Sequence, residues 1–134
     1  SINETLNEIE ELFSIFDDPK DRFAQLMDIA KESEGLSDNE RTDEAKVSGC
    51  TSQAWVVGDR GDNSTFIFRT ESDAMIVKGL LVLLEKIFNG KPVDEILSVN
   101  STDILNSVGL DGAITSQRTN GFSNAVEKIQ GIVK

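Results

Sequence analysis

The chain of 134 residues carries 13 Lys and Arg against 24 Asp and Glu, and it contains no histidine and a single cysteine. A chain of this length buries enough surface to fold without a disulfide or a metal, so residues 1–134 are expected to form one domain. A net charge of -11 repels phosphate backbones and anionic lipid surfaces, which disfavours nucleic acid and membranes as partners. One cysteine without histidine also excludes a self-contained zinc or iron site of the usual ligand types.

No stretch of the sequence approaches the roughly 20 apolar residues that cross a bilayer, and its beginning lacks the basic start of a signal peptide. We therefore expect a cytoplasmic protein in a compartment that keeps its thiol reduced. Ser1 is compatible with proteolytic processing, so a targeting segment removed before it stays an open alternative.

Two amphipathic helices are predicted in the first part of the chain. Apolar residues recur at helical spacing within residues 2–16 and leave glutamates on the opposite side. Asp18 followed by Pro19 is a typical helix start and predicts a second helix from there to about Ser33. Gly35 then supplies a residue that adopts the left-handed conformation at a helix end.

The periodicity changes to two after a polar loop that ends near Glu44. It predicts three short strands: Lys46–Ser48, Gln53–Val57 and Thr65–Thr70. The glycines, aspartates and asparagine of residues 58–63 predict a hairpin turn between the second and third strands. Cys50 then lies in the first connection of a small antiparallel sheet.

The longest apolar segment predicts a central helix that begins after Ser72, ends near Asn89 and forms the core, because it is apolar nearly all round. Further helices are predicted at Asp94–Leu97, Thr102–Val108 and from Ser116 onward. The predicted fold class is α+β, with a small three-stranded antiparallel sheet and helices packed on one side.

Cys50 carries the one thiol, and residue identities exclude several common thiol chemistries. The absence of histidine excludes cysteine–histidine hydrolases. A cysteine phosphatase requires arginine six residues later, where this chain has Val56, and a cysteine peroxidase requires threonine three residues earlier, where it has Val47. A thioredoxin-type exchange requires a second cysteine.

The remaining chemistry is a thiol that accepts a group and passes it on while partner proteins supply acid, base or cofactor. Gly49 permits a tight loop, and the N–H groups of Thr51 and Ser52, with the Ser52 hydroxyl, are candidates to stabilise a thiolate. A buried structural cysteine is the alternative, because cysteine is among the most buried residue types. The residues by themselves leave both interpretations open.

Segments from most of the chain match one known family in order and spacing. "VSGCTSQAW" (residues 47–55) resembles its V-x-G-C-x-S-x-V/A-W segment, and "ESDAMIVKGLLVLL" (71–84) resembles its S-D-A-x-I-V-x-G-L-x-x-L helix start. Gly109-Leu110 followed by "SQRTNGF" (116–122) is similar to its L-G-L and S-x-R-x-N-G-L ending, and Asp21-Arg22-Phe23 to its D-R-[YF]. Together these segments resemble the SufE family, the sulfur acceptors of iron–sulfur cluster assembly.

The resemblance implies a single SufE-like domain over residues 1–134, with the small α+β fold that SufE shares with IscU-like cluster scaffolds. It implies that Cys50 takes persulfide sulfur from a cysteine desulfurase of the SufS type, stimulates that enzyme and passes the sulfur to a downstream iron–sulfur scaffold. The desulfurase uses pyridoxal phosphate (PLP), whereas this chain is expected to hold no cofactor and to have no independent turnover. We expect a monomer or a weak homodimer.

The resemblance also implies residues that place the loop or contact the desulfurase: Gly49, Thr51, Ser52, Asp73 and Arg118. Asp73 has a structural alternative, because the first turn of a helix favours an acidic residue whatever its function. Arg118 opposes the helix dipole, and Gly121 costs about 1 kcal/mol relative to alanine inside a helix. Helix stability therefore does not account for the segment that contains both residues.

Other matching positions have simpler explanations. Trp55 is expected to pack in the sheet, because a tryptophan in a strand usually buries most of its surface. Close packing on the central helix explains Lys78 and Gly79. Ser48 and Thr51 stand where the family commonly has proline and glutamine, which affects the stiffness of the loop but removes no chemistry.

Two other functions stay as alternatives. A non-catalytic scaffold or interaction protein would share the fold, but one cysteine and no histidine cannot supply the usual four ligands of a cluster. A thiol redox sensor would use a reactive Cys50 and show oxidation without sulfur transfer. Desulfurase turnover measured with Cys50→Ser separates these functions from a sulfur carrier.

Overall fold

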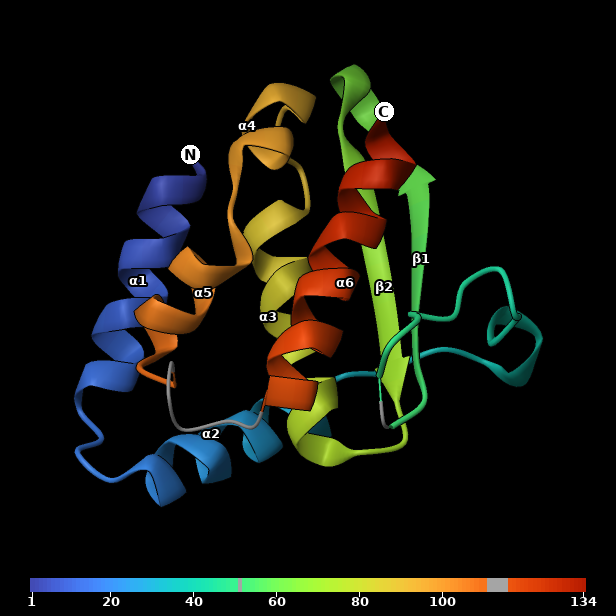
Figure 1. The fold of residues 1–134 in the computed structure, drawn as a ribbon. Coiled ribbons are helices and arrows are strands. Elements are labelled where there is room, and N and C mark those ends of the chain that lie inside the picture. The colour runs from blue at the N-terminus through green and yellow to red at the C-terminus, as the bar shows by residue number, and fades with distance from the viewer. Residues whose placement is uncertain (51, 111–115) are drawn as a thin grey trace.

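The fold is described from a computed structural model that covers residues 1–50, 52–110 and 116–134, with the backbone alone at 116–118. In chain order it comprises α1 (Ile2–Ser14), α2 (Pro19–Lys31), β1 (Ala54–Arg60), β2 (Phe66–Ser72), α3 (Met75–Phe88), α4 (Val93–Ser98), α5 (Ser101–Val108) and α6 (Ser116–Val133), with short 3-10 turns at η1 (Asp38–Glu40) and η2 (Asp62–Ser64). The predicted α+β class is confirmed, and Figure 1 shows the helices gathered beside one narrow sheet.

The predicted helices are confirmed with small shifts at their ends. The Asp18 carboxylate accepts a hydrogen bond from the Lys20 N–H at 2.9 Å and caps α2, as the Asp-Pro pair predicts. Gly35 has a φ of +66° just beyond α2. Within the described residues, none of the helices combines the length and the apolar composition that crossing a bilayer requires.

The prediction of three strands is wrong, because the sheet of the described residues consists of β1 and β2 alone. The segment predicted as the first strand makes one isolated bridge, from Lys46 to Trp55. The Val47 N–H donates to the Ala54 carbonyl at 2.8 Å, but pairing goes no further because the chain turns at Gly49, whose φ is +77°. A segment this short cannot extend the ladder.

The hairpin turn lies later than predicted. Strand β1 continues to Arg60, and the turn falls at η2, where Asn63 and Ser64 adopt φ values of 57° and 62°. The Gly61 N–H donates to the Thr65 carbonyl at 2.8 Å and closes the hairpin. The sequence therefore predicts the hairpin turn correctly, but the turn lies further along the chain than residues 58–63, by about half the length of that segment.

Helix α3 forms the centre of the core, as its apolar composition predicts. The helix begins at Met75 and not directly after Ser72, because Ser72 still belongs to β2. The Ser72 hydroxyl nevertheless accepts a hydrogen bond from the Ala74 N–H at 3.2 Å. Gly79 lies against the backbone of Leu26 in α2, where a Cβ atom would overlap the Leu26 carbonyl. Close packing at Gly79 is therefore confirmed.

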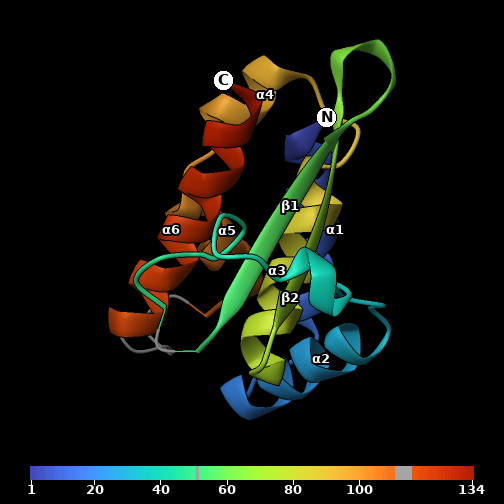
Figure 2. The same ribbon diagram turned by 90° about the vertical axis from the view of Figure 1, so that its right-hand side faces the viewer.

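The two faces of the sheet are covered differently. Helices α3 and α6 pack against the inner face, whereas the segment of residues 35–47, here named the strap, crosses the outer face (Figure 2). Leu36 and Ala45 of the strap bury Trp55, which keeps 9% of its surface exposed. The strap leads directly into the loop that carries Cys50.

Candidate functional site

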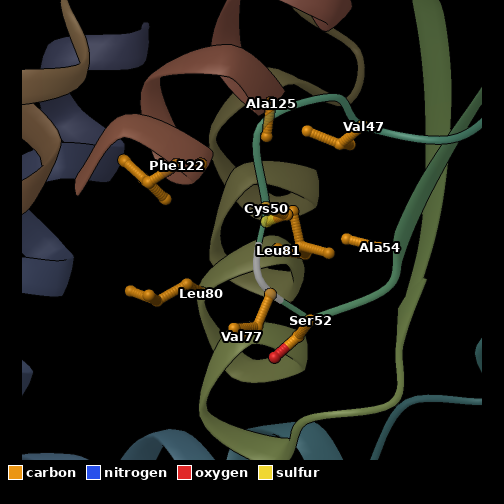
Figure 3. A pocket seen from close by; sticks show the side chains of 10 residues that line it. Val47, Cys50, Ser52, Ala54, Val77, Leu80, Leu81, Phe122 and Ala125 are labelled. Carbon is orange, nitrogen blue, oxygen red and sulfur yellow. The ribbon is translucent and has the colours of Figure 1, made fainter. Parts of the chain in front are cut away.

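Cys50 lies at the rim of a small apolar cavity between the strap, β1, α3 and α6. The cavity has a volume of about 20 Å³, which is room for roughly one water-sized group. Its described lining is Val47, Cys50, Ser52, Ala54, Val77, Leu80, Leu81, Gly121, Phe122 and Ala125 (Figure 3). Cys50 itself is half-buried, so its thiol is sheltered without being sealed in the core.

Gly121 of α6 makes the space that the thiol occupies. A Cβ atom at this position would lie 2.7 Å from Cys50 Sγ, closer than real Cβ contacts allow. Glycine is unfavourable inside a helix, but α6 requires it at this position because the helix packs directly against the loop that carries Cys50. The sequence identified an unexplained glycine, and the structure shows that Cys50 is what it contacts.

Asn124, one turn further along α6, holds the loop just before Cys50. Its side-chain amide donates to the Ser48 carbonyl at 2.9 Å. The same amide occupies the place that a Cβ atom on Gly49 would take, and the φ of +77° at Gly49 also favours glycine. The tight backbone conformation expected at Gly49 is observed, and its role in the site stays a prediction. Asn124 was missed because an asparagine on a helix carries no distinctive signal in the sequence.

Asp73 holds the loop just after Cys50. Its carboxylate accepts a hydrogen bond from the Gln53 N–H at 3.0 Å, and its own N–H donates to the Gln53 carbonyl at 3.2 Å. The Ser72 hydroxyl donates to the same carbonyl at 2.8 Å. Asp73 precedes Ala74, the N-cap residue of α3, so the prediction that it lies in the first helical turn is wrong.

The structure gives the positions of some of the remaining predicted site residues, and others lie outside the described part of the chain. Ser52 lines the cavity, as Figure 3 shows. Thr51 and the side chain of Arg118 lie outside the described residues, so their predicted contacts stay predictions. Trp55 of β1 is buried, as predicted, and it packs beneath the strap. Lys78 forms an ion pair with Glu71 at 3.1 Å, a contact that the sequence did not predict.

The site offers a thiol in an apolar surrounding rather than a metal centre. No group of three or more His, Cys, Asp or Glu side chains is placed to hold a metal ion within the described part of the chain. Polar contacts hold the loop on both sides of Cys50, at Ser48 and at Gln53, while the thiol faces hydrocarbon between them. This arrangement shelters the thiol while leaving Cys50 partly exposed.

Comparison with known proteins decides the family. The model of the SufE family, described as an Fe-S metabolism associated domain, matches residues 7–133. The chain belongs to the SufE family. A SufE-like protein of Rhizobium etli is 35% identical over 130 residues, which cover 94% of this chain and 87% of the relative.

Other matches differ in how much of the other protein they cover. The SufE-like protein 1 of Arabidopsis thaliana, named chloroplastic/mitochondrial, is 35% identical over 93% of this chain but only 33% of its own length. A chloroplastic quinolinate synthase of Nicotiana tabacum is 31% identical over 84% of this chain and 16% of its own length. A solved structure of a hypothetical protein from Thermus thermophilus shares the fold, with a TM-score of 0.76, 21% identity and coverage of 96% of this chain and 93% of that one.

Proposed function

We propose that this SufE-family protein carries sulfur for iron–sulfur cluster assembly as a persulfide on Cys50. The sulfur comes from a PLP-dependent cysteine desulfurase, which the carrier frees for another turnover, and goes to a cluster scaffold. The carrier acts in the cytoplasm, holds no cofactor of its own and has no independent turnover. The observation that supports this function best is the position of the Cys50 thiol at an apolar cavity with room for one further small group.

The transfer is a thiolate–persulfide exchange. The Cys50 thiolate attacks the outer sulfur of the desulfurase persulfide, and a new sulfur–sulfur bond forms at Cys50 Sγ as the old one breaks. The desulfurase cysteine leaves as a thiolate, which takes the electron pair of the broken bond. The exchange therefore requires no external oxidant or reductant.

The resting geometry suits protection, and attack requires the loop to open. An incoming persulfide must align with the attacking sulfur, whereas Cys50 at rest faces Gly121 and the apolar lining of the cavity. Among the described residues, polar contacts of Ser48 with Asn124 and of Gln53 with Ser72 and Asp73 hold the loop closed. A docking partner that competes for these contacts releases the thiol, and the cavity afterwards shields the persulfide from stray thiols and oxidants.

Mass spectrometry of the intact protein tests the function. After incubation with a cysteine desulfurase, PLP and cysteine, the wild-type chain is expected to gain the mass of one sulfur atom, and Cys50→Ser is expected to gain none. Reduction with dithiothreitol removes the added sulfur and serves as the control for a persulfide. An unchanged wild-type mass, with a desulfurase shown to be active on its own, contradicts the proposal.

A further inference from the structure

Glu71 is a buried carboxylate outside the Cys50 cavity, at the end of β2, with 6% of its surface exposed. Its Oε1 accepts from the Ser72 N–H at 3.0 Å and lies 3.1 Å from Lys78 Nζ. Its Oε2 accepts from the Leu36 N–H and from Arg41 Nη2, both at 3.3 Å. A buried charge is tolerated only when it is paired and hydrogen-bonded in this way.

The carboxylate is held in its charged form. Burial alone would raise the pKa of Glu71, but the Lys78 ammonium and the N–H groups of Ser72 and Leu36 outweigh burial and hold the pKa below its ordinary value. The side chain is therefore anionic at neutral pH. Two of its partners, Leu36 and Arg41, belong to the strap, so the charge binds the strap to the sheet and to α3.

The strap packs closely against the Glu71 carboxylate. Gly35 has a φ of +66°, and a Cβ atom there would overlap the Glu71 carboxylate. Arg41, besides its contact with Glu71, lies over the Trp55 ring at 5.7 Å. The strap thus covers Glu71 and Trp55 together, and these two residues face each other across the strands.

Contacts on both sides of Cys50 connect its loop to the region around Glu71. Before Cys50, the strap pairs with β1, where the Val56 N–H donates to the Ala45 carbonyl and the Val47 N–H to the Ala54 carbonyl, both at 2.8 Å. After Cys50, Gln53 is held by Ser72 and Asp73, which directly follow Glu71 in the chain. The segment that begins at Glu71 therefore anchors the chain on both sides of the thiol.

We infer that Glu71 is a positioning residue for the Cys50 loop: its buried charge fixes the strap and, through the strap, the resting place of the thiol. Loss of the charge leaves Lys78 and Arg41 without their shared anionic partner and weakens the acceptor of the Leu36 N–H, so the strap lifts from Trp55 and the loop loses its anchor before Cys50. The functional role of this positioning rests on the proposed sulfur transfer. The positioning itself can be measured on this protein alone, without a desulfurase.

The sequence provides one probe for each step. Trp55 is the only tryptophan, so quenching of its fluorescence by acrylamide reports how far the strap covers it. Cys50 is the only cysteine, so the rate of labelling by iodoacetamide in native buffer reports access to the thiol. Glu71→Gln is expected to increase Trp55 quenching and to raise the labelling rate roughly fivefold or more, as for a loss of about 1 kcal/mol in the closed loop.

Three control variants separate positioning from general loosening. Glu40→Gln removes a strap carboxylate that pairs with Arg69 nearer the surface, and it is expected to change the labelling rate less than twofold. Ile104→Val weakens the core in α5, far from the strap, and is expected to leave both signals unchanged in the folded protein. Glu71→Asp keeps the charge and is expected to lie between wild type and Glu71→Gln.

The outcomes decide the inference. It is overturned if Glu71→Gln is labelled at the wild-type rate, if Glu40→Gln or Ile104→Val is labelled as fast as Glu71→Gln, or if the Asp and Gln variants are labelled equally fast. Should Glu71→Gln fail to fold, Arg41→Gln takes its place, with a smaller increase in both signals expected and an unchanged labelling rate overturning the inference. Failure of sulfur transfer to wild type would instead remove the proposed function and leave these results intact.

Discussion

The Cβ position of Gly121 lies 2.7 Å from Cys50 Sγ, so the closed loop and a side chain at residue 121 exclude each other. This contact joins a residue near the middle of the chain to one near its end. The position of the thiol at rest therefore depends on how α6 packs against the loop. A substitution at Gly121 is the most direct way to change that position.

Gly121→Ala is expected to displace Cys50 from its cavity. Alanine favours the helix by about 1 kcal/mol, which offsets part of the steric penalty, so the fold is expected to persist while the labelling rate of Cys50 rises roughly fivefold or more. Iodoacetamide labelling measures the rate. Gly131→Ala, on the same helix, is the matched control, because a Cβ there meets no described atom within 4 Å, and it should raise stability without changing the labelling rate.

Asn124→Ala is expected to loosen the loop before Cys50. The variant removes the hydrogen bond to the Ser48 carbonyl, a contact worth about 1 kcal/mol, so labelling of Cys50 accelerates while urea unfolding changes by a similar amount. Asn7→Ala, at an exposed asparagine of α1, serves as the comparison. Equal labelling rates in the two variants would show that the Ser48 contact does not hold the loop.

Asp73→Ala is expected to loosen the loop after Cys50. Because the Gln53 N–H loses its acceptor, the closed loop is weakened by about 1 kcal/mol, and the Gln53 amide exchanges its hydrogen faster. Hydrogen exchange followed by mass spectrometry or NMR measures this change. Asp28→Ala, an exposed position on α2, controls for the loss of a charge; a Gln53 amide that exchanges no faster than in that control would contradict the assignment.

Glu85→Gln is expected to stabilise the protein at pH 7 and not at pH 4. Burial raises the pKa of Glu85 above its ordinary value, against the effect of its hydrogen bonds with Thr70. A carboxyl with a raised pKa favours folding while it is protonated, and this contribution is lost as the pH rises through the pKa of the folded state. The gain at pH 7 is expected to be about 0.5 kcal/mol or less, because solvent screens part of the side chain.

Urea unfolding at the two pH values measures the effect of Glu85→Gln. Glu127→Gln, an exposed glutamate on α6, is expected to show a smaller difference between the two pH values. An equal gain at pH 4 and pH 7 would show that the charge of Glu85 is not the cause.

The sequence predicted the elements whose signals are local. Helical periodicity, the Asp18-Pro19 start and the apolar length of α3 placed the helices, because side-chain spacing and capping act within a few residues. Residue identity alone limited the chemistry to one thiol without histidine. The motif around Cys50 indicated the family, which the match over residues 7–133 confirms.

The tertiary structure decided what depends on contacts between distant residues. Periodicity cannot show that the segment at Lys46 pairs through a single bridge, or that Gly121 makes room for the Cys50 thiol. Nor can it show that Glu71 is buried among partners 30 and 35 residues away in the chain. Such positions are fixed by packing and by the pairing of buried charge, whose free energies depend on which surfaces meet in three dimensions.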